Sequence, residues 1–228
     1  MRVARTSTTP RARGVFRAPA LFLLAAVALT ACRGSGFDYI GSPDRKAYFQ
    51  VPLEWKKFTK HDLLAASGQD VSDATTQTLP WLVAYDASPQ PAADHVLALQ
   101  AAVKHPVVLA QTVALDFASR DQISLATIRN QIYPVDELVN NDGAEIRDYE
   151  ELALEGGYRG IRIEYDVITQ GTSMVTSGNQ VIRVHQVGII DHASENLYLF
   201  AVRCEAHCYE ENAKLIDQIV ESWQVKEL

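Results

Sequence analysis

The strictest pattern in the sequence is an alternation of apolar and charged side chains between Tyr158 and Ile168. The alternating residues are Ile161, Arg162, Ile163, Glu164, Tyr165, Asp166 and Val167. Successive side chains of a β-strand point to opposite faces, so the segment is predicted to be a strand with one apolar and one charged face. Strands of this kind are typical of antiparallel sheets. The chain is therefore expected to build an antiparallel sheet.

Two more strand segments come next, Gln180–Ile190 and Leu197–Arg203. A Gly/Ser/Thr-rich reversal over residues 169–178 and a turn over residues 191–196 separate the three segments, which predicts an antiparallel meander. The last segment, Glu210–Trp223, carries apolar residues at helical spacing, with Glu210 and Glu211 in the expected first turn. It is predicted to be a helix docked on the sheet.

The first half of the globular region is less regular. Lys46–Pro52 predicts a strand, with Glu54–Phe58 as its hairpin partner across a tight turn. Two further strands are predicted at Trp81–Asp86 and Val107–Leu115. The segment Asp94–Lys104 fits either a short helix or an extended edge piece.

A capping box at Ser119–Gln122 predicts a helix that runs to Pro134. No internal repeat and no second linker interrupt the chain after the first strand. Residues 46–228 are therefore predicted to form one α+β domain, an antiparallel sheet with helices packed on it.

The N-terminus has the composition of an export signal. Five arginines and no acidic residue occupy the first seventeen residues, and the stretch Ala18–Ala31 carries no charge. Its apolar core, Ala20–Leu29, is ten residues long. A membrane-spanning helix needs roughly 20 apolar residues to cross about 30 Å of hydrocarbon. The core is therefore too short to be a permanent helical anchor.

The four residues Leu29–Cys32 resemble the lipobox of bacterial lipoprotein precursors. The resemblance implies cleavage before Cys32 and a diacylglyceryl group on its sulfur, with further acylation such as palmitate. Residues 1–31 are then a signal peptide, and residues 32–45 are the lipidated cysteine and a flexible tether. Such a protein is held at the extracytoplasmic face of the cell membrane. The alternative is an ordinary secretory signal that happens to end beside a cysteine.

The charge balance limits the partners. All five arginines of the signal precede the cleavage site, so the mature chain keeps 16 of 21 basic residues against 28 acidic residues, a net charge of −12. A field of that sign repels nucleic acid and anionic headgroups. We therefore expect no nucleic-acid partner, and we expect membrane attachment to come from the lipid on Cys32 rather than from a basic patch.

The two remaining cysteines, Cys204 and Cys208, lie four positions apart. In an oxidising compartment a disulfide between them is the default expectation. The alternatives are free thiols and a metal site formed with His207. A metal site would lack a fourth ligand, and the spacing is not that of a standard zinc knuckle.

Several short motifs resemble the PsbP/Mog1-like fold. The segment Tyr48–Trp55 is similar to that fold's opening F-x-V-P-x-x-W hairpin, Leu154–Gly160 to its central glycine hairpin, and Ser222–Val225 to its C-terminal motif. The chain also resembles a set of actinobacterial lipoproteins that use this fold and carry a CxxxC before the last helix. The resemblance implies an α-β-α sandwich that acts as a binding or assembly module, without enzyme chemistry.

A search for reactive motifs is negative. The sequence contains no G-x-S-x-G elbow, no H-E-x-x-H, no phosphate-binding loop and no EF-hand loop. His185 alternates with Arg183 and lies in a strand that can neighbour Glu164 or Asp166; the two interpretations are a polar ligand site and the solvated face of the sheet, and the second is favoured. His61, His192 and His207 are scattered. We expect no cofactor and no metal.

The aromatic residues Trp55, Trp81 and Trp223 are predicted to be core rather than ligand platforms. Three functions remain. The first is a non-catalytic, lipid-tethered module that binds an envelope protein. The second is a small-molecule or lipid carrier with a pocket between the sheet and the helix Glu210–Trp223, and the third is an enzyme of unrecognised type. The negative motif search disfavours the third most.

Overall fold

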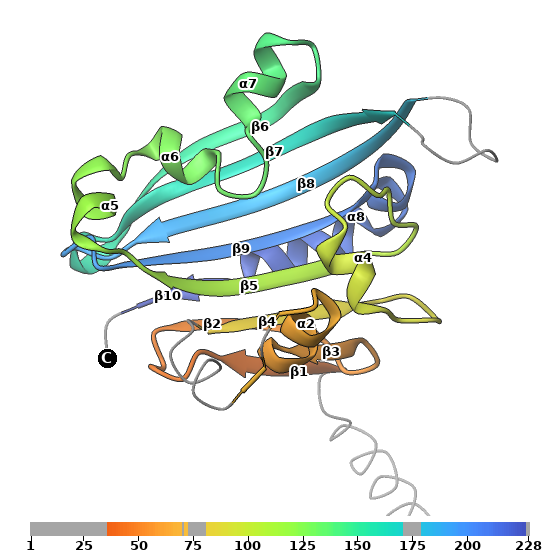
Figure 1. Cartoon of the computed structure of the whole chain (residues 1–228), viewed down its shortest axis with the longest axis horizontal. Helices are drawn as coiled ribbons and strands as arrows, with labels where there is room; N and C mark the ends of the chain where they lie inside the picture. The colour runs from red at the N-terminus through yellow and green to blue at the C-terminus, as the bar shows by residue number, and fades with distance from the viewer. Residues whose placement is uncertain (1–35, 70, 73–80, 171–178, 227–228) are drawn as a thin grey trace, which may run out of the picture. The chain divides into compact units, whose positions relative to one another are not determined.

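The computed structural model describes residues 36–69, 71, 72, 81–170 and 179–226, and its compact domain begins at Phe37. A seven-stranded antiparallel sheet runs through it (Figure 1). In spatial order its strands are β3 (Lys56–Thr59), β4 (Leu82–Asp86), β5 (Val107–Ala114), β9 (Asn196–Glu205), β8 (Asn179–Ile190), β7 (Arg159–Gln170) and β6 (Ala144–Ala153).

A small three-stranded sheet is formed by β1 (Phe37–Gly41), β2 (Ala47–Pro52) and β10 (Gln224–Val225). It packs with α8 (Ala206–Glu221) against one face of the large sheet, around a core that includes Phe49, Phe200 and Ile219. The opposite face is covered by α5 (Phe117–Gln122), α6 (Leu125–Arg129) and α7 (Val135–Asn140), which bury Ile128 and Val135 against β7 and β8 (Figure 1). The predicted α+β class is confirmed.

The meander of β7, β8 and β9 agrees with the sequence pattern. Arg159 pairs with Ile190 at one end of the β7–β8 ladder and Gln170 with Asn179 at the other. A one-residue slip would turn every side chain of a strand to the other face, so the two-sided pattern specifies this register strongly. Part of the predicted reversal, residues 171–178, lies outside the described residues.

The predicted hairpin between the first two strands is wrong. Both edges of β2 are occupied, by β1 and by β10, while β3 pairs with β4. The turn between β2 and β3 closes with a hydrogen bond from the Trp55 amide to the Pro52 carbonyl, and the Trp55 side chain is buried. The turn thus carries the chain from the small sheet to the edge of the large one.

The predicted tether over residues 32–45 is also too long. Its segment Phe37–Gly41 is strand β1, which pairs with β2 along its whole length. The reason is Ile40, which is buried at 6% exposure against the core of the domain. The folded domain therefore begins before the expected boundary at residue 46.

The helix predicted from Ser119 to Pro134 is two helices. Asp116 caps α5 by accepting a hydrogen bond from the Ser119 amide, and Ser124 caps α6 by accepting one from the Thr127 amide. Ile123 between them is extended, because two competing N-caps each start a helix of their own. The segment that begins at His61 and Asp62, a candidate helix start in the sequence, lies in helix α2 (Lys60–Ala66). Helix α7 and the 3-10 turn Glu155–Gly157 were not predicted, and α4 (Ala93–Leu97) occupies only the start of the undecided segment.

The C-terminal helix begins earlier than predicted, at Ala206, so Glu210 and Glu211 lie beyond its first turn. Its buried residues are Cys208, Tyr209, Ile216, Ile219 and Val220. In the part of the chain that the structure describes, no helix combines the length and apolar character needed to cross a membrane.

Candidate functional site

The polar residues singled out from the sequence meet on the face of the large sheet that carries α8. In the β7–β8 ladder Glu164 stands opposite His185, and Asp166 stands opposite Arg183. On the other side of β8, His185 pairs with an apolar residue of β9, Val202. The face therefore changes from apolar under α8 to charged toward β6.

Arg183 and Asp166 form the inner ion pair of this cluster. Arg183 Nε donates to Asp166 Oδ1 at 2.7 Å, and Arg147 from β6 donates to Asp166 Oδ2 at 2.7 Å. Burial alone would raise the pKa of the Asp166 carboxyl, but the hydrogen bonds from the two arginines outweigh it and hold the pKa below its usual value. Asp166 is therefore ionised and fully engaged.

His185 lies next to this pair and beneath α8. Its Nδ1 is 3.0 Å from the Tyr209 hydroxyl, which lies 3.4 Å from Glu164 Oε2. The His185 side chain is only 12% exposed, and burial lowers its pKa to about 4. Burial also raises the pKa values of Glu164 and of the Tyr209 hydroxyl. For Glu164, the Arg183 guanidinium 3.7 Å away opposes the effect of burial on the pKa without cancelling it.

The interpretation of His185 as a residue of a solvated sheet face is therefore wrong. Since α8 starts at Ala206, its second turn lays Tyr209 over the strand and covers His185. The Arg183 guanidinium lies 5.6 Å from the centre of the Tyr209 ring. The charged groups of this cluster pair with one another, and their contacts with Tyr209 hold the first half of α8 on the sheet. Its role is therefore structural.

Tyr209 and Arg147 were not singled out from the sequence. The sequence pattern could have identified Tyr209, because it precedes Ile216 by seven positions, or two helical turns, and so continues the apolar stripe of the helix. No sequence pattern could have identified Arg147, because it lies at a register irregularity between Ile146 and Asp148 on β6, where simple strand alternation does not apply.

The predicted disulfide between Cys204 and Cys208 is present. It joins the end of β9 to the first turn of α8, with the two Cα atoms 6.0 Å apart. Both sulfurs are engaged, so the alternative metal site is excluded, and His207 instead points outward to Glu211 at 3.3 Å. Among the described residues, no group of three or more His, Cys, Asp or Glu side chains is arranged to hold a metal ion.

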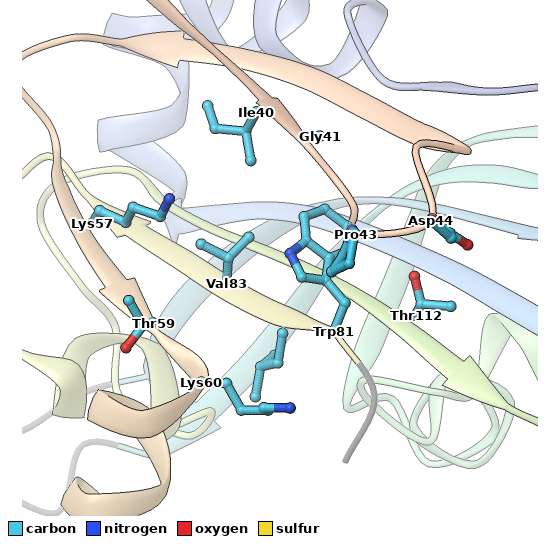
Figure 2. Close-up of a pocket in the computed structure, with 11 residues that line it drawn as sticks. Ile40, Gly41, Pro43, Asp44, Lys57, Thr59, Lys60, Trp81, Val83 and Thr112 are labelled. Carbon is cyan, nitrogen blue, oxygen red and sulfur yellow. The ribbon is translucent and has the colours of Figure 1, made fainter. Parts of the chain in front are cut away.

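The interface between α8 and the sheet is filled, since Ile216, Ile219 and Val220 are all at most 1% exposed. A hollow of about 580 Å³ lies elsewhere, between β1 and the strands β3 and β4. Figure 2 shows Trp81, Val83, Ile40 and Lys57 around it. Trp55 and Trp223 are core residues as predicted, whereas Trp81 is half-buried at this hollow.

The lipidation residue Cys32, together with the predicted signal peptide, lies outside the described residues. The structure therefore places only the folded domain on its C-terminal side, which begins at strand β1.

The domain is of the α+β class, an antiparallel sheet between helices and a second small sheet. No family model matches the sequence, and no curated protein matches it.

Similar solved structures do exist. The cyanobacterial PsbP protein CyanoP from Synechocystis sp. PCC 6803 matches with a TM-score of 0.47 at 13% identity, over 86% of this chain and 97% of that one. The Ran-binding protein Mog1p from Saccharomyces cerevisiae matches with a TM-score of 0.41 at 9% identity, over 83% and 95% of the two chains. A Pseudomonas aeruginosa protein of unknown function gives 0.43 at 8% identity, over 85% and 100%. The first two belong to the fold that the sequence motifs resemble, and at these scores none of them says what this chain binds.

The depressed pKa of His185 predicts an acid-sensitive fold. The unfolded chain takes up a proton on this histidine near pH 6.5, whereas the folded chain does so only near pH 4, so stability falls as the pH drops through that window, by up to about 3 kcal/mol. Glu164, with its raised pKa, acts in the opposite direction. The free energy of unfolding in urea is therefore measured at pH 7 and at pH 4.5 for the wild-type protein and for His185→Gln. The wild type should lose more stability between the two pH values than the variant does. His192→Gln, at an exposed site, is the control; equal pH dependence in all three proteins would contradict the prediction.

The disulfide predicts a small effect on stability. Reduction should raise the intact mass by about 2 Da, and loss of the bridge should lower the free energy of unfolding by about 2 kcal/mol or less, because the closed loop is so short. The measurements are intact mass spectrometry and urea unfolding of the Cys204→Ser/Cys208→Ser double variant. An unchanged mass on reduction would disprove the bridge.

Proposed function

We propose that the chain is an extracytoplasmic lipoprotein, cut before Cys32 and acylated on its sulfur, whose domain binds a protein partner at the cell envelope without catalysing a reaction. The observation that carries the proposal is the arginine-rich and then apolar N-terminus that ends in Leu29–Cys32. Only residues 33–36 separate this cysteine from the first strand, β1.

The disulfide gives independent support for export. Disulfides form and persist outside the cytoplasm and are rare where thiol reductants are abundant. The bridge between Cys204 and Cys208 therefore fits a domain that works on the outer side of the cell membrane.

The non-catalytic role is supported by the polar cluster. Arg183, Asp166, His185 and Tyr209 use their polar atoms on one another, and their contacts hold α8 in place. A catalytic acid or base needs a path to a substrate atom within hydrogen-bond reach. These side chains are covered instead.

The protein-binding role is supported by the outer strand of the large sheet. Among the strands that the structure describes, none pairs with the second edge of β6, and most residues of β6 are exposed. Such an edge offers backbone hydrogen-bonding groups to an added strand. Its acidic side chains, Glu145, Asp148, Glu150 and Glu151, disfavour pairing with a second copy and favour a partner strand that carries Lys or Arg.

The lipid is tested by metabolic labelling. Radiolabelled palmitate should enter the wild-type protein and be lost in Cys32→Ala, because the variant has no sulfur to acylate at the cleavage site. The Cys204→Ser/Cys208→Ser double variant is the matched control and should keep the label. Label that persists in Cys32→Ala would rule out the lipoprotein assignment.

The partner surface is tested by photo-crosslinking in living cells. A photo-crosslinking amino acid in place of Asp148, on β6, should give a discrete adduct with an envelope protein, because the partner strand would lie beside it. The same amino acid in place of Asp121, which is exposed on α5, should give none. Adducts of equal yield at both sites would contradict a partner on β6.

A further inference from the structure

The small sheet presents a second face, away from the core, at the start of the folded domain. In the pairing of β1 with β2, Ile40, Phe49 and Val51 face the core. Alternation then turns a second set of side chains outward. The outward set is Tyr39, Gly41, Tyr48, Gln50 and Gln224, whereas Phe37 packs against the core and Pro52 is buried.

This outer face carries two tyrosines, Tyr39 and Tyr48, and an exposed leucine borders it. Tyr39 is 73% exposed, and Leu53, in the turn directly after β2, is 64% exposed. Tyrosine is typical of surfaces that are apolar at one end and wet at the other. The face thus resembles an interface rather than ordinary solvated surface.

The face also lacks negative charge. None of the outward residues of β1, β2 and β10 is acidic, although the mature chain would carry a net charge of −12. Asp38 belongs to the other face of β1, and Glu54 lies at the rim beside Leu53. A positive charge lies over the face instead, because the Lys226 ammonium is 5.4 Å from the centre of the Tyr48 ring.

The outer face of the small sheet lies close to Cys32 along the chain, and this closeness indicates what the face contacts. Five peptide steps join Cys32 to Phe37, and even a fully extended chain covers at most about 18 Å over that distance. Phe37 begins β1, and it pairs with Pro52, next to Leu53. The exposed apolar side chains therefore start where the tether ends.

From these observations we propose that the outer face of the small sheet rests on the lipid bilayer that holds Cys32; the inference depends on the acylation proposed above. Tyr39 and Leu53 enter the headgroup region, where amphipathic and apolar side chains are favoured. Lys226 faces anionic headgroups, and the acidic remainder of the domain is repelled from them. The bilayer thus selects one orientation of the domain.

The test places an environment-sensitive fluorophore on single introduced cysteines. The native cysteines are three, Cys32, Cys204 and Cys208, of which the first is acylated and the other two are bridged, so an introduced thiol is labelled selectively. The sites are Tyr39→Cys and Leu53→Cys on the face, with Ile146→Cys on β6 as the control, since Ile146 is 41% exposed and lies on the far edge strand. The acylated full-length mature protein is reconstituted in phosphatidylcholine/phosphatidylglycerol vesicles.

The readout is quenching by spin-labelled lipids that carry the nitroxide near the headgroup. We expect the probes at positions 39 and 53 to shift to the blue and to be quenched roughly threefold more than the probe at position 146, because only they enter the interfacial layer. An intact mass from the same sample reports acylation.

Three outcomes would overturn the inference. Equal quenching at positions 39, 53 and 146 in acylated, vesicle-bound protein would refute it while leaving the lipoprotein proposal intact. A blue shift that depends on protein concentration and not on quencher lipid would assign the face to a second copy of the chain. An intact mass without acyl chains would overturn both proposals together.

Discussion

The fold depends on the packing of Phe49 against aromatic rings from the other end of the chain. Its ring centre lies 5.1 Å from that of Phe200 on β9 and 6.0 Å from that of Trp223, and these two stack on each other at 5.0 Å. Aromatic side chains bury the largest apolar areas and gain further from such geometry. This contact fixes the small sheet on the large one, and with it the direction in which β1 presents its outer face.

The face of the large sheet that carries α8 has an apolar half and a charged half. In one row across the strands, Phe200 pairs with Val187, Val187 with Arg162, and Arg162 with Glu150. The apolar half is covered by α8 and the small sheet, and the charged half is open toward β6. Where the two halves meet, the buried atoms Arg162 Nε and Trp223 Nε1 have no hydrogen-bond partner within the described residues. Each such atom lowers the stability of the fold locally.

The sequence predicted the features in which a local pattern and a tertiary requirement coincide. Strands β7 to β9 and the inner stripe of α8 follow from periodicity alone, and the disulfide follows from cysteine spacing and compartment. The partners of β2 and the burial of His185 did not follow, because the first depends on which edges β1 and β10 occupy and the second on where α8 starts. The split between α5 and α6 was missed because Asp116 and Ser124 each cap a helix within a few residues.

These constraints also relate the two proposed surfaces. The small sheet packs on the part of the large sheet that contains β4, β5 and β9, and β6 is the last strand on the opposite side of the order. If the outer face of the small sheet lies on the bilayer, the layer of α5 to α7 on the opposite face of the large sheet points away from it (Figure 1), and no described strand pairs with the second edge of β6. The aromatic contacts of Phe49 therefore place the small sheet, whose outer face is proposed to meet lipid, at the other side of the strand order from β6, the edge proposed to meet protein.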